Sequence, residues 1–129
     1  MVRLGTEEDL PAIERLQSEA AVWPVRDYLQ YELWVVEKSG TISGFAVYRS
    51  LGDEERELLN MAVAPEFRRQ GLGRELLNST LRQRVFLEVR VSNLAAQALY
   101  QSAGFVICGR RKKYYSSPYE DALVMEWQE

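Results

Sequence analysis

The sequence predicts one α/β (α+β) domain over residues 1–129, in which helices flank a mixed, mostly antiparallel central sheet. Its 129 residues suit a single domain, and 47% hydrophobic with 27% charged residues is ordinary for a globular protein. The chain opens with helical patterns and then three strand-like runs. The third of these runs is followed by a helix and then by another strand. Strands joined by short turns pair antiparallel, whereas a strand-helix-strand crossover pairs parallel, so both pairings are expected.

The first half of the chain is expected to hold two helices and then three strands. Thr6 or Asp9 can cap a first helix that runs to about Ala21, because their short polar side chains accept hydrogen bonds from the first N–H groups of a helix. A short second helix is expected at 25–30. Strands are expected at 33–37, 41–49 and 57–64, joined by a hairpin turn at 39–40 and a charged turn at 52–55.

The second half is expected to hold two more helices and three more strands. A central helix is predicted by four leucines that share one face at helical spacing: Leu72, Leu76, Leu77 and Leu81. Alternating apolar residues predict a strand at 85–91, and Ser92-Asn93 caps a helix at 94–103 that Gly104 ends. The last two strands are expected at 105–115 and 122–127, joined by a long hairpin loop at 116–121.

Charge and composition exclude several classes of function. With 16 basic and 19 acidic residues the net charge is −3, so no nucleic-acid partner is expected. The absence of histidine removes histidine-dependent nucleophiles and histidine metal sites, and no metal is expected. Cys108 is the single cysteine and is expected to be a buried structural thiol. The lack of a long apolar run or a signal-like start predicts a cytoplasmic protein without a membrane partner. The protein is expected to be a monomer or a weak dimer.

The stretch 58–77 combines a buried strand, a tight loop and an amphipathic helix. Three cationic side chains and two glycines lie in or beside this loop: Arg68, Arg69, Gly71, Gly73 and Arg74. The glycines let the backbone approach a ligand, and a helix N-terminus offers unpaired N–H donors with a partial positive charge. The stretch therefore predicts a phosphate or pyrophosphate site. A basic surface turn that only caps the helix is the alternative.

This loop, read as Arg-x-x-Gly-x-Gly after a strand ending in Ala-Val-x-Pro, resembles the acyl-CoA pyrophosphate loop of the GCN5-related N-acetyltransferase (GNAT) family. The resemblance implies a GNAT-like sheet and acetyl-CoA as the acetyl donor. It implies that the cofactor is bound by backbone groups of the strand and by the loop: Met61, Ala62, Val63, Arg68, Arg69, Gln70, Gly71, Leu72, Gly73 and Arg74.

A longer resemblance runs from Leu87 to Phe105. The segment begins Leu-Glu-Val-Arg-Val-Ser-Asn and continues through Ala-Leu-Tyr to Gly-Phe. It looks like the protein N-terminal acetyltransferase branch of the family, typified by the bacterial ribosomal-protein-alanine N-acetyltransferases. The resemblance implies that Glu88 is the proton acceptor, that Asn93 and Ala96 line the pantetheine arm, and that Tyr100 protonates the leaving sulfur.

The residues themselves suit this chemistry. Transfer of an acetyl group to an amine needs the neutral amine, yet an α-amino group with a pKa of about 8 is mostly protonated at pH 7. Glu88 lies in an otherwise apolar strand, where a carboxylate could take that proton directly or through one water. Two alternatives stay open: a solvent-facing Glu88 paired with Arg90, and a Tyr100 that is only a core aromatic.

The acceptor is expected to be the N-terminal α-amine of a protein such as a ribosomal protein. Tyr114 and Tyr115 lie in the final hairpin, where their hydroxyls could bind the backbone of a substrate, and Trp23 before Pro24 loosely matches an aromatic-proline element of the family. The region before the third strand is short for this family. An acetyltransferase for a small amine or a lysine side chain, and a non-catalytic acyl-CoA-binding module, are the other hypotheses.

Overall fold

The computed structural model describes residues 1–17, 24–68, 70–116 and 119–129. Its Cα positions divide the chain into two compact units, which we describe separately. Unit 1 comprises residues 1–49 and 58–81, and unit 2 comprises residues 50–57 and 82–129. Among the described residues, no helix has the length and apolar character needed to span a membrane.

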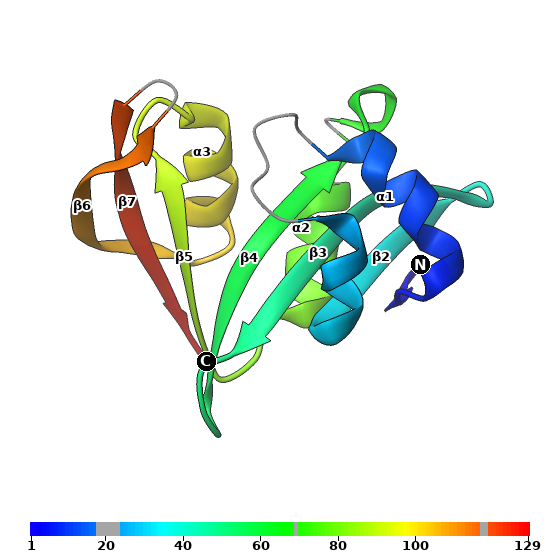
Figure 1. Ribbon diagram of the computed structural model, residues 1–129, viewed down its shortest axis with the longest axis horizontal. Helices are drawn as coiled ribbons and strands as arrows, with labels where there is room; N and C mark the ends of the chain where they lie inside the picture. Colours follow the sequence, from blue (N-terminus) through cyan, green and yellow to red (C-terminus); the bar gives the residue numbers. More distant parts are fainter. Residues whose placement is uncertain (18–23, 69, 117–118) are drawn as a thin grey trace. The chain divides into compact units, whose positions relative to one another are not determined.

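Unit 1 holds the N-terminal strands and most of the described helices (Figure 1). Its elements are β1 (Val2–Leu4), the 3₁₀ helix η1 (Glu7–Asp9), α1 (Leu10–Leu16), the 3₁₀ helix η2 (Val25–Gln30), β2 (Glu32–Lys38), β3 (Thr41–Ser50), β4 (Glu55–Val63), the 3₁₀ helix η3 (Pro65–Phe67) and α2 (Leu72–Thr80). The last residue of β3 and the first three of β4 belong to unit 2.

Two layers of side chains cover the strands of unit 1. On one face, α1 and η2 pack on β2 and β3 through a buried apolar cluster of Ile13, Tyr28, Leu33, Val35, Phe45 and Val47. On the other face, α2 buries Leu76 and Leu77, and the hydroxyls of Tyr48 and Thr80 lie 2.6 Å apart in a buried hydrogen bond. Because both faces of β3 are covered, its residues 43–48 are all buried.

Unit 2 is built on β5 (Arg84–Arg90), α3 (Leu94–Ser102), β6 (Val106–Ser116) and β7 (Tyr119–Gln128). β7 pairs antiparallel with both β5 and β6, while Glu55–Glu57 at the start of β4 pairs in parallel with Arg84–Phe86 of β5. Over the described residues the seven strands are hydrogen-bonded in the order β1-β2-β3-β4-β5-β7-β6. The predicted mixed, mostly antiparallel sheet is therefore confirmed.

The structure differs from the predicted elements in four places, three predicted boundaries and one strand that was not predicted. α1 ends at Leu16, because Gln17 has extended backbone angles (φ −69°, ψ 136°); the rest of the predicted extension to Ala21 lies outside the described residues. β1 was not predicted, because three residues are too short to show a period. β4 begins at Glu55, inside the predicted turn. The predicted loop at 116–121 is mostly strand, since Ser116 pairs with Tyr119 and Tyr115 with Glu120.

The charged side chains at the start of the chain form a compact cluster in unit 1. Arg3 donates two hydrogen bonds to the Asp9 carboxylate, at 2.8 and 2.9 Å, and a third to Glu37 Oε1 at 2.7 Å. The Thr6 N–H also donates to Asp9 Oδ2, at 2.8 Å. The Asp9 side chain is only 8% exposed, and the hydrogen bonds from Arg3 hold its pKa below the ordinary value.

We expect Asp9→Asn to lower the free energy of unfolding by about 2 kcal/mol at pH 7, because it removes one of the two charged partners of the half-buried Arg3. The pKa of Asp9 is lower in the folded state, so its contribution to stability is complete above the unfolded pKa of about 3.9 and disappears as the pH falls through the folded value. Urea denaturation at decreasing pH should therefore show the two proteins converging. Glu8→Gln, an exposed neighbour in η1, is the control and should cost less than about 0.5 kcal/mol.

Candidate active site

The loop between β4 and α2 in unit 1 has the backbone that an anion site requires. Gly71 caps α2 in the left-handed conformation, with φ of 77°, and a Cβ built on it would meet no described atom within 4 Å. The first helical bond of α2 runs from Glu75 N–H to Gly71 O at 2.9 Å, so the N–H groups before Glu75 have no acceptor within the helix. The glycine therefore serves the turn and leaves open space beside these donors.

The side chains of this loop are only partly as predicted. Arg68 and Arg74 are exposed, and Arg68 Nε donates to Val63 O at 3.3 Å; Arg69 lies outside the described residues. Gln70 binds within unit 1, because its Oε1 accepts a hydrogen bond from Lys38 Nζ. Lys38, at the end of β2, is thus a further cation beside the loop. It was missed because it lies 32 residues away in the sequence.

The three predicted backbone positions of β4 are half-buried, and one of them is already hydrogen-bonded. The Met61 N–H donates to Asn60 Oδ1 at 2.8 Å, and Asn60 Nδ2 donates to the Tyr28 hydroxyl at 3.1 Å. The Tyr28 hydroxyl in turn donates to Gln17 Oε1. The Met61 N–H is therefore already occupied by a side chain of the same strand.

The central side chain of unit 2 is Glu88 on β5. Val85, Leu87 and Val89 are buried on one face of this strand, so Glu88 lies on the other face, with its side chain 18% exposed. Its Oε1 accepts a hydrogen bond from Arg111 Nη1 at 2.6 Å, whereas its Oε2 is buried and has no hydrogen-bond partner among the described residues. One oxygen of the carboxylate is therefore held by Arg111, and the other is buried.

The alternative pairing of Glu88 with Arg90 is wrong. Arg90 Nη1 donates instead to Glu120 Oε2 at 3.1 Å, and Glu120 Oε1 accepts from the Ser92 N–H at 3.1 Å. Hydrogen bonds from Ser92, and then the charge of Arg90, hold the pKa of Glu120 below its ordinary value. Glu120 thus braces the turn that leads from β5 into α3.

Tyr114 of β6 lies beside Glu88. The guanidinium carbon of Arg111 is 4.2 Å from the centre of the Tyr114 ring, a cation–π contact. Desolvation, followed by the negative charge of Glu88, raises the pKa of the Tyr114 hydroxyl. The side chain of Tyr115 and the whole of Trp23 lie outside the described residues.

The helix α3 carries the other predicted residues of unit 2. Asn93 is its N-cap, with Oδ1 accepting from the Ala96 N–H at 3.1 Å. Tyr100 is half-buried and its ring centre lies 5.7 Å from that of Phe105. None of the helix residues is buried, and Leu94 is 71% exposed. Glu88 and Tyr100 thus belong to the same compact unit.

The edge strand β6 corrects one further expectation. Cys108 is exposed rather than buried. It is the extra residue of a β-bulge, because Ile107 pairs with Met125 and Gly109 with the adjacent Val124. The basic residues that follow it lie on this edge strand, and Arg110 Nε donates to Asp121 Oδ2 at 2.6 Å.

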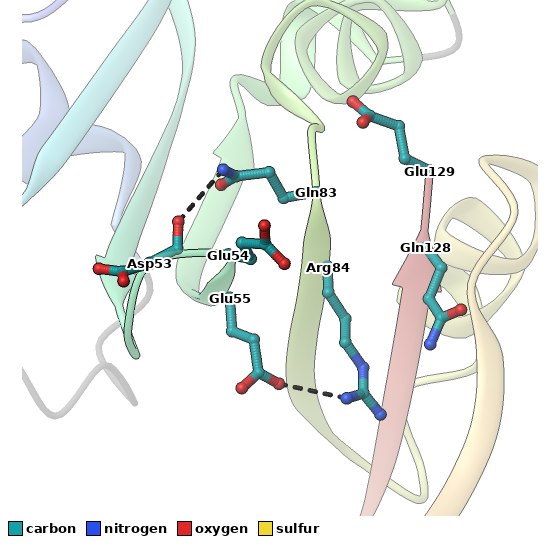
Figure 2. Close-up of a pocket in the computed structure, with 7 residues that line it drawn as sticks. All are labelled: Asp53, Glu54, Glu55, Gln83, Arg84, Gln128 and Glu129. Carbon is teal, nitrogen blue, oxygen red and sulfur yellow. Dashed lines mark hydrogen bonds and ion pairs between the residues drawn. The ribbon is translucent and has the colours of Figure 1, made fainter.

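Figure 2 shows a separate hollow at the other end of β5. It measures about 750 Å³ and is lined by Asp53, Glu54, Glu55, Gln83, Arg84, Gln128 and Glu129. Arg84 donates to Glu55 at 3.3 Å, and Gln83 Nε2 to Asp53 O at 3.2 Å. None of the predicted site residues lines it. Among the described residues, no cluster of acidic or cysteine side chains has the arrangement of a metal site.

Three of these features are typical of an acyl-transferring enzyme. They are the mixed sheet, the glycine turn at the start of α2, and strand β5, which carries the Glu88 carboxylate and leads into the Asn93-capped helix α3. The model of the acetyltransferase (GNAT) family matches residues 6–105. The chain therefore belongs to the acetyltransferase (GNAT) family.

Curated and solved relatives agree with this assignment. The ribosomal protein bS18-alanine N-acetyltransferase of Escherichia coli K12 is 35% identical over 136 residues, covering 91% of this chain and 89% of that protein. The crystal structure of the ribosomal-protein-S18-alanine N-acetyltransferase from Escherichia coli has a TM-score of 0.82 at 31% identity, with 98% of this chain and 92% of that chain covered. Ard1 from Thermoplasma volcanium has a TM-score of 0.88 at 27% identity, covering 98% and 95%.

A GNAT family acetyltransferase from Elizabethkingia anophelis, crystallised with acetyl-CoA bound, shares the fold. Its TM-score is 0.78 at 23% identity, with 100% of this chain and 97% of that chain covered.

Proposed function

We propose that this chain transfers the acetyl group of acetyl-CoA to the N-terminal α-amine of a protein, in particular a ribosomal protein. The observation that carries the proposal is the Glu88 carboxylate, whose Oε1 is held by Arg111 while its buried Oε2 has no partner among the described residues. Such an oxygen can accept the proton of an amine. The name of the Escherichia coli relative, an alanine N-acetyltransferase of ribosomal protein bS18, supports the acceptor.

The cofactor assignment rests on family membership and on the fit of the loop. Acetyl-CoA supplies an activated acetyl thioester and carries a pyrophosphate. The N–H groups at the start of α2, the open space beside Gly71 and the exposed Arg68 and Arg74 suit that pyrophosphate. The other proposed contacts of the loop with the pyrophosphate are Arg69, Gln70, Leu72 and Gly73. The proposed contacts with the pantetheine arm are Met61, Ala62, Val63, Asn93 and Ala96.

Glu88 is the proposed base. An α-ammonium gives its proton to Glu88 Oε2, directly or through one water, and the neutral nitrogen then forms a bond to the thioester carbonyl carbon. The half-buried setting favours the transfer, because water competes less for the carboxylate oxygen there. The backbone N–H groups of Ala62 or Val63 are the proposed donors to the carbonyl oxygen, on which negative charge develops.

Tyr100 is the proposed acid. When the tetrahedral adduct collapses, the carbonyl re-forms, the carbon–sulfur bond breaks and the phenol donates its proton to the departing sulfur. The nitrogen releases its remaining extra proton to water, and the phenol is reprotonated from solvent. The ring is fixed by its contact with the buried Phe105, which supports a defined position for the hydroxyl.

Tyr114, Tyr115 and Trp23 are the proposed contacts for the acceptor. The position of Tyr114 beside Glu88 supports its role, because a residue that binds the first peptide unit of a substrate has to lie near the base. A base also generates free amine more readily from an α-ammonium than from a lysine with a pKa of about 10.4, a difference of roughly 3 kcal/mol. This difference favours the α-amine over a lysine side chain.

We expect Gly71→Asp to abolish detectable binding of acetyl-CoA, because the new side chain fills the open space beside the α2 donors and adds a like charge. Gly40→Asp is the matched control: Gly40 also has a left-handed backbone (φ 75°) with no described atom within 4 Å of a built Cβ, so the two variants share the same strain. Titration calorimetry should show binding by the control and none by Gly71→Asp. Equal affinities in two folded variants would contradict the phosphate role of the loop.

We expect Tyr100→Phe and Glu88→Gln each to lower kcat by about 10²-fold, because each removes one proton transfer. Acetyl-CoA affinity should change little in either variant. Steady-state rates at pH 7, together with calorimetry, measure both quantities. Full activity of Tyr100→Phe would make this tyrosine structural, and full activity of Glu88→Gln would remove it as the base.

We expect a peptide with a free N-terminal alanine and no lysine to be acetylated faster than the same peptide N-acetylated and carrying one internal lysine. Initial rates measured by mass spectrometry compare the two, with spermidine as the small-amine substrate. A preference for the lysine peptide or for spermidine would move the chain to another acceptor class. Binding of acetyl-CoA without turnover of any acceptor would favour the non-catalytic module.

A further inference from the structure

We propose that Arg111 is a positioning residue for the base: its guanidinium holds one oxygen of Glu88 so that the other faces the acceptor amine. The inference rests on the proposed function, because it takes Glu88 as the proton acceptor. Neither the glycine loop nor the Leu87–Phe105 segment contains Arg111, which lies 23 residues after Glu88.

The first observation is the asymmetry of the Glu88 carboxylate. Oε1 accepts from Arg111 Nη1 at 2.6 Å, the distance of a strong charge-assisted hydrogen bond. Oε2 is buried, and the described residues give it no hydrogen bond. A buried carboxylate oxygen without a donor is costly unless a further group binds there. The acceptor ammonium, or the water that carries its proton, has the charge and the hydrogen that this oxygen requires.

The second observation is that Arg111 is itself held in place. In a regular strand, residues 111 and 114 point to opposite faces. Between Arg111 and Tyr115, however, β6 advances four residues while β7 advances only from Ala122 to Glu120. This irregularity lets the Tyr114 ring lie against the guanidinium, with Arg111 Cζ 4.2 Å from the ring centre. A planar group that stacks on one side and donates at its edge has few other orientations.

The third observation is the balance of charge around Glu88. Two carboxylates act on this cation, since Glu88 first and Glu57 of β4 more weakly raise the pKa of Arg111. Tyr114 is the other titratable neighbour from β6, and the residue opposite Glu88 on β7 is the uncharged Val124. Among the described residues, Arg111 is thus a cation that interacts with two carboxylates, and such a group of charges still attracts an ammonium group.

Arg111 can be tested against a closely matched arginine. Arg110 precedes it on the same strand, is equally exposed (56% against 55%) and also donates to a carboxylate at 2.6 Å, but that carboxylate belongs to Asp121. We expect Arg111→Gln to lower kcat about tenfold with an unchanged KM for acetyl-CoA, because the base loses its orientation. Arg110→Gln should change neither quantity.

Two further variants separate positioning from general structure. Arg111→Lys keeps the charge but loses the planar guanidinium, so it should recover kcat only in part. In a Glu88→Gln background, Arg111→Gln should cost nothing more, because a residue that acts through Glu88 has nothing left to orient. Equal acetyl-CoA affinity of all variants by calorimetry confirms that each is folded.

The outcomes distinguish this inference from the proposed function. If Glu88→Gln is impaired but Arg111→Gln keeps the wild-type kcat, the positioning role is wrong and the base assignment stands. If Glu88→Gln is fully active, the base assignment falls and this inference falls with it. Additive losses in the double variant would show that Arg111 acts elsewhere than through Glu88.

Discussion

A carboxylate can lie half-buried on a sheet only where a donor compensates for the lost water, and the Arg111–Glu88 hydrogen bond meets this requirement in unit 2. The register of the strands makes the bond possible, because β7 stands between β5 and β6 and aligns Ala122 with both Arg90 and Arg111. A slip of one residue in β5 would move Glu88 to the buried face and Leu87 to its place. The alternation of buried and half-buried side chains along β5 therefore sets both the register of the sheet and the face on which Glu88 lies.

Further ion pairs hold β5 in the same arrangement. Arg84 donates to Glu126 of β7 at 2.5 Å, and Arg90 donates to Glu120 of the same strand at 3.1 Å, so β5 is tied near both ends. The second pair also reaches the helix that follows, through the Ser92 N–H and then the Asn93 cap of α3. The side chains between these ties, Phe86 and Glu88, share their face of the strand.

The parts of the fold that the sequence predicts are those whose pattern is local. Leucines at helical spacing predict α2, the Asn93 cap predicts the start of α3, and alternation predicts β5. What could not be predicted depends on partners distant in the chain or on backbone irregularity. The register shift at Cys108 cannot be recognised from the amino-acid composition of β6. Glu88 pairs with Arg111 and not with Arg90 because of the order of the strands in the sheet. Glu88 itself was identified by a family motif, which a single alternating strand would not have supplied.

Two glycines of unit 1 show why a motif identifies some backbone sites and not others. Gly71 has a left-handed backbone that the turn requires and open space where the proposed ligand would lie, and it belongs to a recognisable pattern. Gly44 of β3 is required for the opposite reason, because a Cβ there would lie 2.9 Å from the carbonyl oxygen of Ala62. That close approach, with the Asn60 side chain bound to the Met61 N–H, sets the backbone of β4 where the acetyl group is proposed to bind. The backbone donors of β4 are thus positioned by a small residue on the adjacent strand, Gly44, and by a polar residue on the same strand, Asn60. The spacing of such residues in the sequence follows no fixed motif.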